Sequence, residues 1–395
     1  MSTFAPPPPI PTERHHGIDA LRGSMMLLGV VLHLAINYVE GPEDGTWPFR
    51  DPQRSPLAGL VVLTIHTFRM PVFFVMSGYF AAMLIERRGV WGYARNRAQR
   101  IVLPSVVSWF VLFPLTMLAF VFVRLQTDQV DDATRAALFT AALKHPWANP
   151  GPIHLWFLEV LIIIQALSLP AVALAGMVPA PLRSLAARAR HALFMGRARW
   201  LLVPVLATLT TITMLPMHRP GIDTPHSFLV SPAILACYTL YFVGGWCIRR
   251  EAGMVGRLIR TGWWHVGLGC GALVLALVAA IAWFVVTGHG QRPAPALLTA
   301  AQATSAAACW LLVLGLIGVA ERVLARPRPV VRWLVDASFW IYLVHLPLCV
   351  VVPWAVSDLP MGAFGRFSIS FVIVSALLAL SYEAVLMIVA PRRGS

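Results

Sequence analysis

The chain contains ten apolar segments that are each long enough, at about 20 residues, to cross the hydrocarbon core of a membrane as an α-helix. In lipid every backbone polar group needs a partner inside the protein, and an α-helix satisfies these groups within one segment. We therefore predict an all-α polytopic bundle of about ten transmembrane helices, at residues 18–39, 57–85, 101–123, 153–175, 200–217, 229–248, 263–287, 296–320, 333–354 and 367–390.

Composition supports a membrane protein and argues against other classes. Hydrophobic residues make up 58% of the 395 residues and charged residues only 12%, whereas about a quarter of a soluble domain is charged. The net charge of +14 does not indicate nucleic-acid binding, because the arginines fall in short loops between apolar segments rather than on one basic face. The five cysteines lie within apolar segments without metal-ligand spacing, so we expect no metal site.

Charge in the loops predicts the orientation of the chain in the bilayer. Successive loops between the predicted spans lie on opposite sides of the membrane. The set of loops that shares a side with the two termini carries, together with the C-terminal end, twenty arginines, and the other set carries seven arginines and lysines. Cytoplasmic loops carry the excess of positive charge. Both termini should therefore lie in the cytoplasm.

The ends and the longer loops are expected to differ in order. Residues 1–17 begin with a proline-rich run and should form a disordered cytoplasmic tail without a signal peptide, while residues 18–391 form a single membrane domain. On the outer side, residues 40–56 and 124–151 are long enough to carry structure. The second loop holds Asp128, Asp131 and Asp132. Two readings stay open, a contribution to a polar ligand site and a solvated connector.

The first apolar segment carries two basic side chains eleven residues apart, Arg22 and His33. The helical rise separates them by about 16 Å, roughly half of the hydrocarbon core. Asp19 lies three residues before Arg22 and shares its helix face. Arg22 either snorkels to the cytoplasmic interface or faces an anionic ligand. His33 lies past mid-membrane, where a histidine is suited to proton transfer unless a neighbour merely satisfies it.

The second apolar segment places a histidine and an arginine on one helix face near mid-membrane, at His66 and Arg69. A charged arginine at that depth costs at least about 2.5–3.5 kcal/mol on insertion scales. Arg69 should therefore face a polar cavity and bind an anion or a carboxylate. Pro71 permits a kink, and Ser77 and Gly78 allow close helix packing.

Further polar residues occur at the ends of other segments. Arg97 and Arg100 lie at the cytoplasmic mouth of the third segment, where they either follow the positive-inside rule or bind phosphate. His154 and Trp156 should lie near the outer interface, where Trp is common in aromatic belts. Glu159 follows deeper in the membrane, and we expect Arg69 or a histidine to be its partner.

His33, His66, Arg69 and His345 all fall in the middle third of the membrane on these boundaries, although their helices alternate in direction. Glu383, in the last segment, is expected to be a buried acid without an evident partner. The convergence predicts a polar chamber with a basic inner mouth. Two protein classes fit it, a membrane enzyme and a proton-coupled transporter of an anionic or sugar solute. A purely structural subunit explains the buried charges poorly.

An ordered set of motifs resembles the membrane acyltransferase-3 family across essentially the whole chain. The set consists of Arg22-x10-His33, F-V-M-S-G-Y-F at 74–80, Arg97-x2-Arg100 with Pro104, and Y-L-V-H-x-P at 342–347. A branch that succinylates osmoregulated periplasmic glucans is most similar, through I-D-A-L-R at 18–22, M-M-L-L-G at 25–29, the run from 66 to 80, and H-L-W-F-L at 154–158.

The resemblance implies an O-acyltransferase of the bacterial inner membrane. A cytoplasmic acyl-CoA, succinyl-CoA or acetyl-CoA, would donate its acyl group to a hydroxyl of a periplasmic glucan or related carbohydrate. His33 corresponds to the family's catalytic histidine and would act as a base or as an acylated nucleophile. We group with it His66, Arg69, Glu159 and His345. We assign the donor to Arg22, Arg97, Arg100 and Ser77. We assign the acceptor substrate to Asp19, His154 and Trp156.

Overall fold

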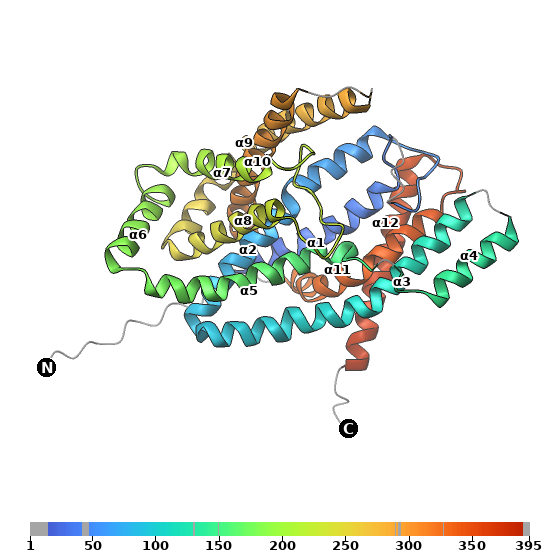
Figure 1. Ribbon diagram of the computed structural model, residues 1–395, viewed down its shortest axis with the longest axis horizontal. Helices are drawn as coiled ribbons and strands as arrows, with labels where there is room; N and C mark the ends of the chain where they lie inside the picture. Colours follow the sequence, from blue (N-terminus) through green and yellow to red (C-terminus); the bar gives the residue numbers. More distant parts are fainter. Residues whose placement is uncertain are drawn as a thin grey trace.

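The computed structural model describes residues 15–41, 47–128, 131–148, 150–288, 290, 294–326 and 328–389 (Figure 1). Throughout these residues the regular structure is helical, without a β-strand, which confirms the all-α class. The proline-rich tail predicted at the N-terminus lies mostly outside the described residues. The α-helices are α1 His16–Ile36, α2 Pro56–Arg97, α3 Leu103–Thr127, α4 Asp132–Lys144, α5 Trp156–Met177, α6 Ala180–Phe194, α7 Leu202–Met214, α8 Pro232–Arg250, α9 Met254–Gly288, α10 Pro295–Val323, α11 Pro329–Ala355 and α12 Ala363–Val389.

Within the described residues the number of candidate membrane spans is seven, or up to eight, rather than the predicted ten. Seven helical stretches are long and apolar enough to cross a membrane, and the pair Ala180–Phe194 and Arg199–Met214, bent by 79°, adds one if it forms a single span. Two predicted spans merge into one continuous stretch, Pro56–Thr127. By itself α7 has only 13 residues, and α8 has 19 and ends in two arginines. The chain is therefore a multi-pass membrane protein with fewer regular spans than expected.

A glycine breaks the long stretch from α2 into α3. Gly89 has φ +69° and ψ 176°, a conformation that only glycine adopts without strain, so the chain turns there. A π-helix, Ala98–Val102, follows and leads into α3. Pro104 lies just inside α3 and has no N–H to donate to the preceding turn. The turn and the π-helix therefore place the Arg97 to Arg100 region between two helical arms.

Helix α1 lies inside the bundle and packs against α11, α2 and α10 (Figure 1). Its N-terminus is capped from α10, because the backbone N–H of Ile18 donates to the buried Glu321 carboxylate at 2.7 Å. A carboxylate at that position also suits the positive end of the helix dipole. Gly17 makes the approach possible, since a Cβ there would collide with the backbone of Glu321. The helix that carries Arg22 and His33 is thus fixed at its first turn.

Helices α2 and α8 approach each other through reciprocal glycines. A Cβ on Gly78 would collide with the backbone carbonyl of Phe242, and a Cβ on Gly245 would collide with that of Val75. Small residues allow this backbone contact between membrane helices. The structure confirms the predicted close packing at Gly78, and it makes α2 a firm support for Arg69.

The loop at 124–151, which was expected to be long enough to carry structure, contains helix α4. Its three acidic residues all serve local contacts rather than converging on a site. Asp131 accepts from the backbone N–H of Thr134 at 2.9 Å and caps α4. Asp132 and Asp128 pair with arginines three and four residues away. These contacts favour the reading of this loop as a solvated connector.

At the end of α8 the carboxylate of Glu251 connects α8 to α6. Glu251 accepts from Arg190 Nε at 2.6 Å and pairs with His191 Nδ1 at 3.0 Å, both from α6. Burial raises the pKa of Glu251, but the hydrogen bonds from these two side chains outweigh burial and hold the pKa below its ordinary value.

The expectation that Glu383 is buried without a partner is wrong. Glu383 is exposed on α12, and its carboxylate accepts a hydrogen bond from Trp333 Nε1 at 2.6 Å.

Candidate functional site

Two histidines from α1 and α11 form a direct hydrogen bond at the centre of the site. His33 Nδ1 lies 2.7 Å from His345 Nε2, and the two rings are inclined by only 24°. His345 Nδ1 lies 2.8 Å from the carbonyl oxygen of Tyr342, which can only accept. His345 Nδ1 therefore carries the proton, and His345 Nε2 accepts from His33 Nδ1. In the neutral pair His33 Nε2 keeps a free lone pair, which is the requirement for a general base.

His33 lies closer to the end of its helix than the sequence suggested. Helix α1 ends at Ile36, so His33 is in its last turn rather than well inside an apolar span that continues to residue 39. The apolar run continues past Ile36 in sequence, but Asn37 and Tyr38 form a turn that ends the helix. The histidine pair therefore lies directly beneath the outer loop at 47–55.

Arg69 reaches the same site across a notch in α1, the space left by the missing side chain of Gly29. The guanidinium lies against the Cα of Gly29, and a Cβ at that position would collide with Arg69 Nη1. Gly29 is one helical turn before His33 and shares a face with Arg22 and His33. Arg69 therefore lies on α1 between the inner arginine and the histidine pair.

Arg69 is buried without an acidic partner. Its side chain is 7% exposed, and among the described residues no carboxylate is within ion-pair distance of it and Nε has no hydrogen-bond partner. A buried unpaired charge is costly and marks a functional site in a membrane. The charge lies within electrostatic range of four histidines, His33, His66, His154 and His345.

The expected pairing of Glu159 with Arg69 or a histidine is wrong. In the described part of the chain Glu159 has no ion pair, and its Oε2 atom is buried without a hydrogen-bond partner. Glu159 lies in the first turn of α5, where the helix dipole favours a carboxylate. The Glu159 side chain is therefore placed by α5 and not by the ion pair that the sequence suggested.

His154 and Trp156 line the interior rather than the lipid interface. They are 7% and 8% exposed, and Trp156 packs on Tyr238 with ring centroids 5.8 Å apart. His154 Nε2 donates to the carbonyl of Leu343 at 3.0 Å, and Tyr342 donates to the carbonyl of His154 at 2.7 Å. These two bonds join the start of α5 to α11. The His154 ring lies 5.2 Å from the His345 ring, edge to face.

His66 belongs to a pocket beside the histidine pair. Its Nε2 lies 3.4 Å from the carbonyl of Ile222, a weak contact. The pocket is mostly apolar and is lined by residues of α2, α8, α9 and α10, among them His66, Tyr241, Ala276, Ala306 and Cys309. The structure thus brings His33, Arg69 and His345 together and places His66 at one side of them.

Two residues that the sequence reasoning missed surround His33. Asn37 is fully buried and donates through Nδ2 to the carbonyl of Cys349 at 2.9 Å, which fastens the end of α1 to α11. Its Oδ1 accepts from Trp47 Nε1 at 2.9 Å. The Trp47 indole is nearly parallel to the His33 ring, inclined by 16° with centroids 6.1 Å apart. The only sequence signal for Asn37 is its position four residues after His33 on a helix that should have continued.

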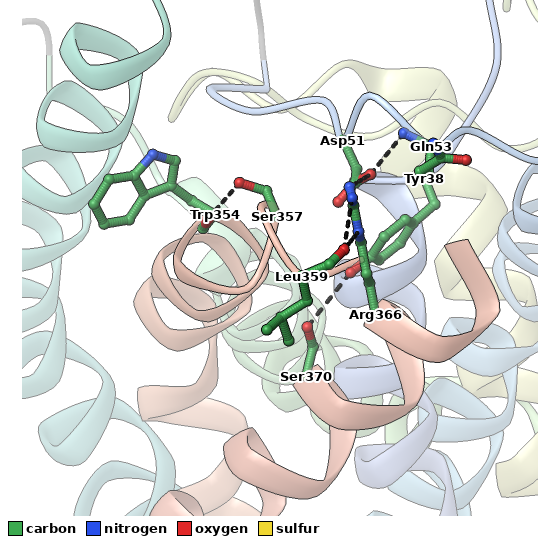
Figure 2. A network of polar contacts seen from close by, with 8 residues as sticks. All are labelled: Tyr38, Asp51, Gln53, Trp354, Ser357, Leu359, Arg366 and Ser370. Carbon is green, nitrogen blue, oxygen red and sulfur yellow. Dashed lines mark hydrogen bonds and ion pairs between the residues drawn. The ribbon is translucent and has the colours of Figure 1, made fainter. Parts of the chain in front are cut away.

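A buried ion pair fixes the outer loop that carries Trp47. Arg366 of α12 donates to Asp51 at 2.8 Å, and both side chains are buried (Figure 2). Arg366 also donates through Nε and Nη2 to the carbonyl of Leu359. The backbone N–H of Asp51 donates to the carbonyl of Asn37 at 2.8 Å, and that of Gln53 donates to Asp51 Oδ1 at 2.7 Å. We call residues 47–55 the outer cap.

A cluster of arginines lies at the opposite end of α1. Arg97 lies over the Tyr93 ring, with its Cζ atom 5.4 Å from the ring centroid, and it is within electrostatic range of Arg22 and Arg100. Among the described residues none of these arginines has an acidic partner, and Arg97 Nε is buried without a hydrogen-bond partner. π-Helices occur often at functional sites. The three arginines that the sequence placed at one mouth therefore do come together.

Two further residues that were predicted to bind substrates, Ser77 and Asp19, lie near other parts of the protein. Ser77 accepts from Gln165 Nε2 of α5 at 3.0 Å, so its hydroxyl joins two helices. Asp19 lies beside a small basic pocket that includes Arg326, Arg328 and Arg332. The donor role of Ser77 and the substrate role of Asp19 stay predictions.

A comparison with protein families gives the class to which the chain belongs. The model of the acyltransferase 3 family, described as an acyltransferase domain, matches residues 15–383. The chain belongs to this family of membrane-bound acyltransferases. The match includes α1 to α11 and most of α12.

Relatives with assigned names resemble only part of the chain. Glucans biosynthesis protein C of Escherichia coli strain 536 and that of strain K12 are each 30% identical to it over 159 residues. The similar region covers 40% of this chain and 39% of those proteins. No solved structure matches the chain.

Proposed function

We propose that the chain transfers an acyl group, a succinyl group in the form we favour, from acyl-CoA to a hydroxyl of a periplasmic glucan or related carbohydrate. The reaction would take place in a bacterial inner membrane. Membership of the acyltransferase 3 family supports the reaction type. The partial similarity to glucans biosynthesis protein C supports the choice of acyl group and acceptor.

One observation carries the proposal, the buried Arg69 beside His33. A guanidinium without a carboxylate partner supplies the positive charge that an acyl transfer needs at its oxyanion. The same group suits the distal carboxylate of a succinyl chain, which it binds through two parallel hydrogen bonds. A histidine with a free Nε2 beside this charge supplies the base.

The histidine pair gives the transfer a defined course. His33 Nε2 takes the proton of the acceptor hydroxyl, and the hydroxyl oxygen attacks the thioester carbonyl carbon. The carbonyl electrons move to oxygen beside Arg69, then return as the carbon–sulfur bond breaks. The thiolate leaves and takes the proton from His33 Nε2. During proton transfer His345 Nε2 holds His33 Nδ1–H in place, as the orienting member of a catalytic triad does.

The three inner arginines would bind the donor. Arg97 lies within electrostatic range of Arg22 and Arg100, and guanidinium groups suit the phosphates of CoA. His154 and Trp156 would border the acceptor side, next to His345. The proposal therefore separates a basic donor end from an outer acceptor end along α1.

A transfer assay on the purified protein in nanodiscs tests the proposal. Radiolabelled succinyl-CoA or acetyl-CoA is supplied with a glucan acceptor, and labelled glucan is measured. We expect transfer that His33→Ala abolishes. Arg69→Lys should reduce succinyl transfer more than acetyl transfer, because an ammonium cannot bind a carboxylate bidentately. Arg135→Lys on exposed α4 is the matched control.

Three results would contradict it. Equal loss of both acyl groups in Arg69→Lys removes the succinyl argument. Retained transfer in His33→Ala removes the mechanism. Solute flux across the membrane without CoA, together with no transfer, supports the transporter instead.

A further inference from the structure

The Trp47 indole occupies one side of the His33 ring, directly above the site. His33 is held at Nδ1 by His345, and Trp47 lies nearly parallel to the same ring at 6.1 Å between centroids. Offset stacking at this distance is favourable for aromatic rings. Two of the approaches to the imidazole are therefore taken by protein, and Nε2 is the ring atom left for a substrate.

Several bonds hold Trp47 in this place, and they come from four elements. Trp47 Nε1 donates to Asn37, whose Nδ2 donates to the carbonyl of Cys349 in α11. The edge of Phe120 from α3 meets the indole at 5.7 Å between centroids. The outer cap is fastened to α12 by the buried pair of Asp51 and Arg366 (Figure 2).

The buried pair is more than a surface contact. Asp51 is 0% exposed and Arg366 is 8% exposed, and removal of one partner from such a pair leaves an uncompensated charge. The ion pair fixes the outer cap on α12, and the cap places Trp47 against His33.

We propose that Trp47 is a positioning and specificity residue that shields the acyl group at His33 from water, so that a carbohydrate hydroxyl receives it. The inference rests on the proposed acyltransferase function. Water is itself a hydroxyl nucleophile. If it replaces the acceptor, its oxygen attacks the thioester carbonyl, its proton goes to His33 Nε2, the carbon–sulfur bond breaks, and a free acid and CoA thiol result.

Water and a carbohydrate differ in size, and the outer cap should exclude water while a carbohydrate hydroxyl can still reach His33 Nε2. A sugar can gain binding energy outside the site and reach Nε2 with one hydroxyl, whereas water gains nothing by binding. An indole over the imidazole removes volume that bulk water would fill, and exclusion of water from an active site prevents such side reactions. Loss of the indole should therefore favour hydrolysis over transfer.

The experiment measures two products from one donor in the full-length protein in nanodiscs. Radiolabelled succinyl-CoA is supplied with a glucan acceptor, and free succinate and succinyl-glucan are quantified. Trp47→Ala should raise the ratio of hydrolysis to transfer by about tenfold or more. Asp51→Asn should raise it in the same direction with Trp47 intact. Trp147→Ala is the matched control and should leave the ratio unchanged, because Trp147 follows α4 and packs on Trp109 and Phe113 of α3.

Trp47→Phe keeps the test decisive if the alanine variant does not fold. The phenyl ring retains an aromatic face but loses the bond to Asn37, so the ratio should lie between those of the wild type and Trp47→Ala. An unchanged ratio in Trp47→Phe relative to Trp147→Phe overturns the proposal, as does an equal fall of both products in Trp47→Ala. A wild-type protein that neither transfers nor hydrolyses the donor contradicts the proposed function instead.

Discussion

The Gly29→Ala substitution tests whether Arg69 is placed by the notch in α1. Alanine adds a single methyl group, and in the structure that group overlaps Arg69 Nη1. The guanidinium is the mobile end of a long side chain, so it can move away by about 1 Å, and a misplacement of this size can cost about 10²-fold in rate. That loss corresponds to about 2.7 kcal/mol of transition-state stabilisation.

Stability and activity should change in opposite directions, which makes the result specific. Alanine is favoured over glycine in a helix interior by about 1 kcal/mol, so Gly29→Ala should not lower the melting temperature. Gly23→Ala is the matched control on the same helix, because its Cβ would meet Leu334 and Val335 at an ordinary 3.4 Å. It receives the same gain in helix propensity without touching Arg69.

The assay is kcat/KM for succinyl transfer to glucan, with the melting temperature measured on the same preparations. We expect a fall of about 10²-fold for Gly29→Ala and wild-type activity for Gly23→Ala. If both variants retain wild-type kcat/KM, the reasoning that ties catalysis to the position of the guanidinium is refuted. If Gly29→Ala loses activity only together with a large drop in melting temperature, the effect is one of folding.

Three further predictions concern other parts of the molecule. His345→Ala should lower kcat by about 10²–10⁴-fold with the donor KM unchanged, because the orienting acceptor for the catalytic ring is lost; an unchanged kcat contradicts this role. Arg97→Gln should raise the KM for succinyl-CoA about tenfold, whereas Arg95→Gln, at an exposed neighbouring position, should not. Glu251→Gln should destabilise the protein at pH 7, because it removes the ion pairs with Arg190 and His191. The loss should be only about 1–2 kcal/mol, because both partners are partly exposed to solvent. Because the pKa of Glu251 is lowered, the difference from the wild type is full above pH 4.5 and should shrink as the pH falls through the pKa of the folded state; a difference independent of pH refutes it.

The helices could be predicted from the sequence because length and hydropathy decide them. Each predicted segment coincides with helical structure, from α1 to α12. What hydropathy cannot show is a change of direction inside a helix. The bend of 79° between Ala180–Phe194 and Arg199–Met214 depends on local backbone conformation. The rest of the difference between ten spans and seven or eight comes from the continuous stretch Pro56–Thr127, where two spans were predicted, and from α7 and α8, which do not qualify as spans by themselves.

The site was predictable where the argument needed only depth. His33, Arg69 and His345 meet as their similar depths suggested. Partner assignments need the direction of each side chain, and Glu159 shows the difficulty, because it lies in the first turn of α5 without an ion pair to Arg69 among the described residues. Trp47 could not be found at all, since an outer loop reveals its packing only after the helices are in place.

The fastening of α1 at both ends has a consequence for its mobility. Glu321 of α10 holds its N-terminal end, and Asn37, bonded to α11 and to the outer cap, holds its C-terminal end. We expect a helix held in this way to stay in place when acyl-CoA binds. Hydrogen exchange along α1 should therefore be equally slow with and without acyl-CoA, and faster exchange in its presence would contradict this expectation.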